Sequence, residues 1–136
     1  MTKEFKDMKG VIAIATTPFN NENLIDFESV DRLSNYYIES KVSGVTILGV
    51  MGEAHKLNIE EQKTLIKRYV NNLINSVPVI VGVSNAGLDN LELLSKFSMD
   101  SGASGVMVSG NNGLKNDDQI KSYFNQVVDR LSLIHI

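Results

Sequence analysis

The chain of 136 residues contains no cysteine, so it has neither a disulfide framework nor a thiolate metal site. This absence fits a reducing compartment, and we expect a cytoplasmic protein. No apolar run approaches the roughly 20 residues that span a bilayer. The polar start, MTKEFKDMKG, also lacks the apolar core of a signal peptide. We therefore expect neither membrane insertion nor secretion.

Clustered positive charge is missing as well. The 13 basic and 16 acidic residues give a formal net charge of −3, and the lysines are dispersed among acidic residues. Nucleic-acid binding needs a basic patch or stripe, so we expect no nucleic-acid partner. His135 has no second histidine, cysteine or carboxylate at ligand spacing, and we expect no metal site. The composition, 43% hydrophobic and 21% charged, is typical of one ordinary globular domain.

Four short β-branched runs lack the alternation of a half-buried strand, which predicts strands buried on both faces of a parallel sheet. They are Val11–Thr16, Val45–Leu48, Val79–Val83 and Val106–Val108. The runs begin at positions 11, 45, 79 and 106, so the repeat is 34, 34 and 27 residues. Each interval is the length of one strand, loop, helix and loop.

Four segments with helical spacing of apolar residues lie between and after these runs. They are Phe27–Tyr37, Ile59–Leu73, Leu88–Phe97 and Ile120–Leu131, with Asp26, Asn58 and Asn116 as candidate N-caps of the first, second and fourth. Asn58 is followed three positions later by Glu61, which predicts a capping box. Gly44 and Gly102 are expected to close the first and third helices in the left-handed conformation, and Pro78 prevents continuation of the second.

Four βα units fit either a small doubly wound sheet or half of a (β/α)8 barrel, which usually needs about 250 residues. The similarity of the units favours the barrel. We expect residues 1–136 to form a single, incomplete barrel domain. A half barrel would leave two strands as open edges and would leave apolar surface uncovered.

The segment Gly44–Glu53, GVTILGVMGE, carries the best functional signal. An apolar strand runs directly into a turn with Gly49, Gly52 and a carboxylate, at the carboxyl end where α/β proteins bind ligands. Glycines permit the close approach and the positive φ of an amide nest for a carboxylate or phosphate. The alternative is a plain βα turn. The pattern matches neither a dinucleotide fingerprint nor a phosphate loop.

Other polar residues follow the same strands. The hydroxyls of Thr16 and Thr17 could bind a ligand or the Glu53 loop, or simply cap the strand end. Glu53 itself either braces neighbouring loops or is a solvated carboxylate. His55 and Lys56 are expected to be exposed loop residues without a catalytic role, because no partner is evident for them.

The third and fourth strands also end in polar residues. Ser84 and Asn85 follow the third, and Ser109–Gly113 follows the fourth. A single mouth at the carboxyl ends is implied. The four tyrosines fall within predicted helices, where core packing is favoured over acid–base catalysis. They are Tyr36, Tyr37, Tyr69 and Tyr123.

Taken in order, the motifs resemble the dihydrodipicolinate synthase and N-acetylneuraminate lyase family of class I, Schiff-base-forming aldolases, from about Gly10 to Arg130. They are Thr16–Phe19, Ile25–Phe27, Gly49–Ala54 at the place of a G[ST]TGE loop, Leu57–Glu61, Pro78–Val83 and Gly102–Ala103. The resemblance implies the N-terminal half of a (β/α)8 barrel.

The resemblance also implies an enzyme whose lysine condenses with pyruvate or a related 2-oxo acid, without a metal or organic cofactor. Val50 and Met51 would be the loop residues that hold the keto acid's carboxylate. Gly49 and Gly52 would shape the turn, and Glu53 would brace it. A homo-oligomer, often a tetramer in this family, is expected.

Two departures from the family pattern affect this expectation. Val50 and Met51 replace a pair of hydroxyl residues, so only backbone amides could hold the carboxylate. The segment Ser109–Gly113 also lacks the tyrosine that synthases carry there, which counts against the dihydrodipicolinate reaction itself.

By the same resemblance, the Schiff-base lysine and the proton-shuttling tyrosine belong to strands beyond Ile136. We therefore expect no catalytic residue within the chain and an inactive fragment. Neither Lys56 nor Lys115 sits on a strand, where desolvation could activate it. The ending LSLIHI does not resemble the expected proline-led strand, which suggests that residues 132–136 are not native sequence. A non-catalytic α/β domain that binds a small anion is the alternative function.

Overall fold

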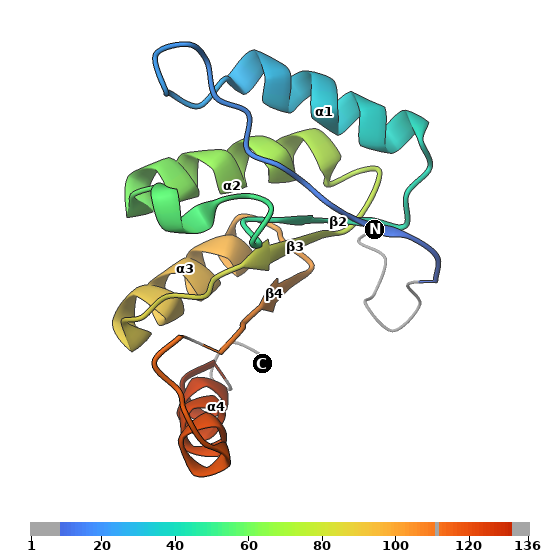
Figure 1. Ribbon diagram of the computed structural model, residues 1–136. Coiled ribbons are helices and arrows are strands. Elements are labelled where there is room, and N and C mark those ends of the chain that lie inside the picture. Colours follow the sequence, from blue (N-terminus) through green and yellow to red (C-terminus); the bar gives the residue numbers. More distant parts are fainter. Residues whose placement is uncertain (1–8, 111, 132–136) are drawn as a thin grey trace.

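The computed structural model describes residues 9–110 and 112–131. Strands and helices alternate along the chain (Figure 1). The elements are β1 (Ile12–Ile14), α1 (Phe27–Glu39), β2 (Gly44–Ile47), the short helix η2 (Ala54–Lys56), α2 (Ile59–Leu73), β3 (Val79–Gly82), α3 (Leu88–Asp100), β4 (Gly105–Met107) and α4 (Asp117–Leu131). The predicted strands and helices are confirmed in type and order. Residues 132–136, with His135, and Asn111 lie outside the described residues.

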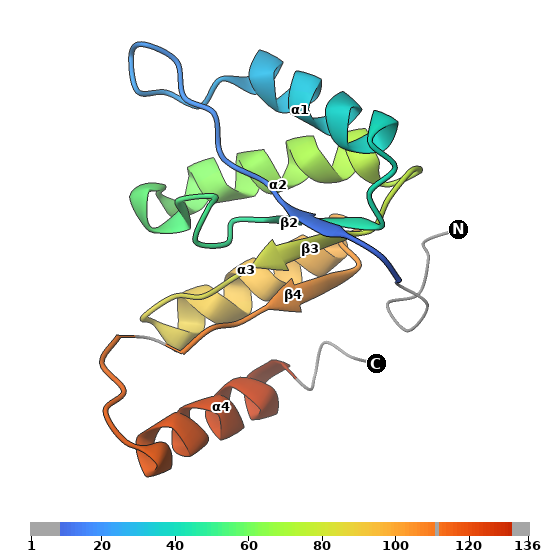
Figure 2. The same cartoon turned by 45° about the vertical axis from the view of Figure 1, so that its right-hand side comes forward.

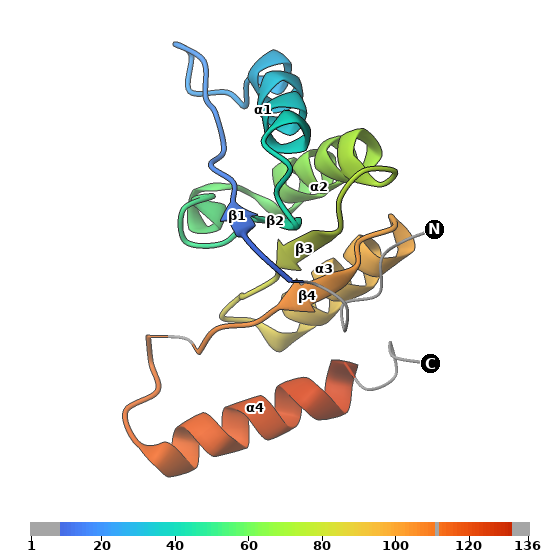
Figure 3. The ribbon, with the colours of Figure 1, turned by 90° about the vertical axis from the view of Figure 1, so that its right-hand side faces the viewer.

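The four strands form one parallel sheet in the order β1-β2-β3-β4. Each strand pairs with the next one along the chain, so the progression never reverses as a doubly wound sheet requires. The chain therefore has the architecture of the first half of a (β/α)8 barrel, as predicted. Figure 3 shows α1, α2 and α3 along one side of this sheet.

Burial separates the inner strands from the outer ones. All residues of β2 and β3 are buried. In β1, by contrast, Ile12 and Ile14 are 39% and 54% exposed, and in β4 Met107 is 41% exposed. Burial on both faces is thus confirmed for the inner strands and wrong for the outer ones. Within residues 9–110 and 112–131, each outer strand lacks a neighbouring strand on one edge, as expected for half a barrel.

The hydrophobic core lies between the sheet and its covering helices. Leu65, Ile66 and Tyr69 of α2 are fully buried and pack with Val45 of β2 and Val81 of β3. Burying such side chains contributes roughly 1.5–3 kcal/mol each. The expected core role of the tyrosines is confirmed for Tyr37, Tyr69 and Tyr123, whereas Tyr36 is exposed.

The predicted N-caps are confirmed by their hydrogen bonds. Asp26 Oδ1 accepts from the backbone N–H of Ser29 at 3.1 Å. Asn58 and Glu61 form the complete capping box, with bonds of 2.9 Å and 2.8 Å. Each cap satisfies an amide that has no partner inside the helix. The Asn116 side chain likewise accepts from Gln119 N–H at 3.0 Å, at the start of α4.

The two glycines expected to close helices behave differently. Gly102, just after α3, has φ +101°, as predicted. Gly44 does not close α1, because that helix ends at Glu39 and Gly44 is the first residue of β2. Lys41 takes the left-handed position with φ +53°. The chain therefore turns earlier than the glycine suggests.

Helix α4 lies past β4, the last strand of the sheet, and contacts α3 (Figures 1 and 2). Arg130 of α4 donates to Asp89 at 2.5 Å and to Glu92 at 3.2 Å. Such exposed ion pairs contribute little to stability, so apolar contacts carry most of this attachment. None of the helices in the described part of the chain combines the length and apolar character needed to cross a bilayer.

Candidate binding site at the carboxyl ends of the strands

The candidate site is the loop from Leu48 to Glu53, which joins β2 to η2. Both terminal residues of this loop are left-handed, Leu48 with φ +55° and Glu53 with φ +53°. Positive φ is uncommon in non-glycine residues and costs of order 1 kcal/mol. Leu48 is only 4% exposed, so its conformation is fixed by surrounding structure. The loop backbone thus reverses at two defined points.

Two glycines permit close backbone contacts around this loop. A Cβ on Gly52 would lie 2.9 Å from the backbone N of Leu48, and one on Gly82 would lie 2.2 Å from the Leu48 carbonyl oxygen. A side chain at either position would displace backbone. Neither Gly49 nor Gly52 has positive φ, so that expected reason for glycine is wrong. Close approach is the reason at Gly52.

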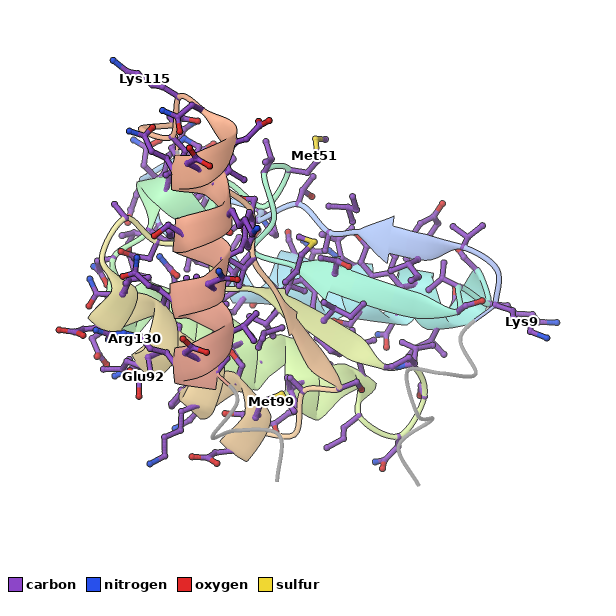
Figure 4. All side chains as sticks on the ribbon, turned by 90° about the horizontal axis from the view of Figure 1, so that it is seen from below. Lys9, Met51, Glu92, Met99, Lys115 and Arg130 are labelled. Atoms are coloured by element: carbon purple, nitrogen blue, oxygen red, sulfur yellow. The ribbon has the colours of Figure 1, made fainter. Side chains whose placement is uncertain are left out.

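Hydrogen bonds inside the loop use two of its amides. Gly52 N–H donates to Gly49 O at 3.0 Å, and Glu53 N–H donates to Val50 O at 3.1 Å. The N–H groups of Val50 and Met51 donate to no acceptor among the described residues. Their side chains are exposed, and Figure 4 shows Met51 projecting from the loop. The two adjacent amides at Val50 and Met51 are therefore available to an anion.

Thr17 holds the loop from β1. Its hydroxyl donates to the Gly52 carbonyl oxygen at 2.6 Å, and Thr17 is 7% exposed. This bond confirms the predicted contact with the Glu53 loop for Thr17, but not for the Thr16 hydroxyl. The Thr16 carbonyl accepts from the Tyr69 hydroxyl at 3.1 Å. Thr16 and Thr17 as ligand-binding residues remain a prediction.

Glu53 pairs with a residue of its own turn. Lys56 Nζ lies 2.7 Å from Glu53 Oε1, and this hydrogen bond and charge lower the pKa of the Glu53 carboxyl. The expectation that Lys56 has no partner is therefore wrong. Both side chains are partly exposed, so the pair stabilises the turn only weakly. His55 is exposed, as expected.

A pair of serines at the ends of β3 and β4 was not anticipated from sequence. Ser84 Oγ lies 3.0 Å from Ser109 Oγ, and the Ser109 backbone N–H donates to Ser84 Oγ at 2.8 Å. Gly82 pairs with Met107 in the sheet, and each serine lies two residues further on. This register is the signal that could have identified the pair. The segments that follow β3 and β4 are therefore joined by hydrogen bonds at the carboxyl edge of the sheet, where a single binding site was predicted.

Apolar side chains lie beside the start of the loop. A Cβ on Gly49 would be 3.6 Å from Met107 Cε of β4 and 3.7 Å from Ile14 Cγ2 of β1. Both are contacts of ordinary length, so the two outer strands reach the loop of an inner one. The carboxyl ends of all four strands therefore converge near Gly49.

The described residues include no lysine on a strand, and Lys56 and Lys115 are both exposed. Within residues 9–110 and 112–131, no three His, Asp or Glu side chains are grouped to hold a metal ion. A shallow hollow lies between the Gly113–Leu114 segment and α4, and it shares no residue with the loop. The loop and strand ends remain the candidate site.

Consecutive parallel βα units with polar groups gathered at their carboxyl ends define this chain as half of a (β/α)8 barrel. The model of the dihydrodipicolinate synthetase family matches residues 7–136. The chain belongs to this family.

Individual curated proteins that resemble this chain support its membership of the family. The chain is 30% identical over 126 residues to the 4-hydroxy-tetrahydrodipicolinate synthase of Methanocaldococcus jannaschii, covering 92% of this chain and 43% of that protein. It is 35% identical over 100 residues to the Thermotoga maritima synthase, covering 74% of this chain and 34% of that one. The chain thus spans less than half the length of the curated relatives it matches.

Solved structures show the same relationship. Dihydrodipicolinate synthase from Rhodopseudomonas palustris superposes with a TM-score of 0.83 at 42% identity, over 88% of this chain and 40% of that one. YagE, a prophage protein of the dihydrodipicolinic acid synthase family from E. coli K12, was solved in complex with pyruvate. It gives a TM-score of 0.82 at 27% identity, over 90% of this chain and 42% of that one.

Proposed function

We propose that this chain provides the 2-oxo-acid carboxylate site of a Schiff-base-forming lyase or aldolase that acts on pyruvate or a related 2-oxo acid. The single observation that carries this proposal is the pair of unused amides at Val50 and Met51. They lie at the carboxyl end of a buried parallel strand, in a loop held by Thr17 and by close contact with Gly82. Adjacent N–H groups suit a carboxylate, which only accepts hydrogen bonds.

The family and the YagE–pyruvate structure support the choice of anion. In such a reaction a lysine amine adds to the C2 carbonyl, and water leaves to give an iminium ion. Loss of a C3 proton then gives an enamine, whose carbon bonds to an aldehyde carbon. Binding the carboxylate at Val50 and Met51 would orient the carbonyl for attack.

The described residues supply no lysine for this step, because none lies on a strand. We therefore propose that the 136-residue chain binds the keto acid but does not form the Schiff base. The completed barrel would supply the lysine and would assemble as a homo-oligomer.

The alternative is a domain that binds small anions without chemistry, favoured by the same two amides and the absence of a strand lysine in residues 9–110 and 112–131. Calorimetry with pyruvate, sulfate and phosphate separates the two functions. Preference for pyruvate is expected from the first. Equal binding of all three anions would support the alternative, and no binding of any would exclude both.

Borohydride trapping tests the chemical step. Reduction with pyruvate should leave the mass of the 136-residue chain unchanged. The same chain fused to the remaining barrel of the Rhodopseudomonas palustris synthase should gain one reduced pyruvyl adduct. A soluble, cooperatively folding fusion that gains no adduct would contradict the proposed lyase or aldolase function.

A further inference from the structure

The Ser84–Ser109 pair has more hydrogen-bonding capacity than its internal bonds use. Ser84 Oγ accepts the Ser109 N–H at 2.8 Å and shares one further hydrogen bond with Ser109 Oγ at 3.0 Å. A hydroxyl has one donor hydrogen and two acceptor lone pairs. If Ser109 donates to Ser84, the Ser84 hydrogen is unused, and if Ser84 donates to Ser109, the Ser109 hydrogen is unused. One O–H donor is left over in either arrangement among the residues that the structure describes.

The leftover donor can reach a ligand, because both serines are exposed. Their positions also place them beside the loop. Ser84 follows Gly82 by two residues, and a Cβ on Gly82 would lie 2.2 Å from the Leu48 carbonyl oxygen. Ser109 follows Met107, whose Cε lies near Gly49, by two residues. Each serine therefore lies two residues beyond the strand residue that is close to the loop, on the carboxyl side of the sheet where the loop also lies.

The loop side chains cannot supply this donor. Val50 and Met51 are apolar, and their N–H groups donate to no acceptor among the described residues. A carboxylate has about four lone-pair sites, so two amides leave it incompletely satisfied. A hydroxyl from the neighbouring strands would add a third donor, and hydrogen bonds to a charged group are the stronger kind.

We propose that Ser84 and Ser109 form a hydroxyl subsite that donates a hydrogen bond to the carboxylate of the 2-oxo acid held by the Val50 and Met51 amides. The proposal rests on the function proposed above. It assigns to β3 and β4 the side-chain contribution that the β2 loop lacks in this chain. It also explains why both strand ends carry a small hydroxyl residue in mutual contact.

The test is calorimetric titration of pyruvate into the 136-residue chain and its variants. Because either serine can donate alone, the informative variant is the double substitution Ser84→Ala with Ser109→Ala. We expect pyruvate binding about tenfold weaker, the usual size of a hydrogen bond to a charged group. Ser101→Ala is the matched control, since that hydroxyl donates to Phe97 O at the far end of α3. It should leave affinity unchanged.

A second variant separates hydroxyl chemistry from loop structure. Ser84→Thr with Ser109→Thr keeps both hydroxyls and should bind pyruvate nearly as tightly as the unchanged chain. Equal affinity of the double alanine variant would overturn the subsite while leaving the proposed function intact. A weakening that the threonine variant does not reverse would also overturn it. Failure of the unchanged chain to bind pyruvate would instead remove the proposed function, and the subsite with it.

Discussion

The inner and outer strands of this sheet have similar sequences but different surroundings. Val81 of β3 is fully buried, whereas Ile14 of β1 is 54% exposed. Both are β-branched residues in short apolar runs. The candidate loop follows β2, an inner strand, and it is held by Gly82 of the other inner strand. The comparison indicates that the candidate site is built on the buried inner strands, while the outer strands contribute side chains at its rim.

The largest expected effect comes from the contact between the inner strands. Gly82→Ala would place a Cβ 2.2 Å from the Leu48 carbonyl oxygen, so backbone must move. We expect destabilisation of about 3 kcal/mol, comparable to severe overpacking. Urea unfolding measures it. Gly87→Ala is the matched control, because its Cβ meets only side-chain atoms at 3.6 Å, and it should cost less than about 0.5 kcal/mol. Equal losses of stability in the two variants would contradict the close contact between Gly82 and the Leu48 carbonyl.

A smaller effect distinguishes burial on the two kinds of strand directly. Val81→Ala should lower the free energy of unfolding by about 2 kcal/mol, because the side chain is fully buried in the core. Ile14→Ala removes more atoms from β1 but should cost under about 1 kcal/mol, since that residue is largely exposed. Denaturant unfolding of both variants checks the order. A larger cost at Ile14 would show that the outer face is covered in solution.

The loop's support from β1 comes next in size. Thr17→Val keeps the shape but removes the buried donor to Gly52 O, and it should cost about 1–2 kcal/mol. Thr64→Val is the control, because its hydroxyl donates to Glu60 O on the exposed surface of α2. It should change stability by less than about 0.5 kcal/mol. If Thr17→Val were equally neutral, β1 would not position the loop.

The smallest effect concerns the surface link between α1 and α2. Asp31 accepts from Arg68 Nε at 2.7 Å and from Asn72 at 2.8 Å, and these bonds lower its pKa below 3.8. The bonds therefore stabilise the fold above pH 3.8, and this contribution is lost as pH falls through the folded pKa. Asp31→Asn should slightly weaken the dependence of the free energy of unfolding on pH in that acidic range, as measured by urea unfolding at a series of pH values. An unchanged profile would show that the pair contributes nothing.

Much of the fold could be predicted because it depends on local chemistry. The capping box of Asn58 and Glu61, the apolar face of α2 and the strand runs all follow from short-range pattern. Exposure of β1 and β4 could not be predicted from their own residues, because it depends on what lies beside the strand. It could be expected only from the half-barrel architecture, which leaves two strands as open edges.

The site was predictable in position but not in detail. The glycines at 49 and 52 suggested positive φ, yet the strain lies at Leu48 and Glu53, where tertiary contacts override residue preference. The link between Ser84 and Ser109 depends on strand register, which no single run determines.

The most direct test of the account follows backbone amide resonances of the 136-residue chain during addition of pyruvate. We predict that the amides of Val50 and Met51 shift most, because they have no acceptor within the described residues. Those of Gly52 and Glu53 should shift less, because they already donate within the loop. Unchanged Val50 and Met51 resonances at saturating pyruvate, or shifts confined to the hollow beside α4, would contradict the assignment of this loop as the 2-oxo-acid site.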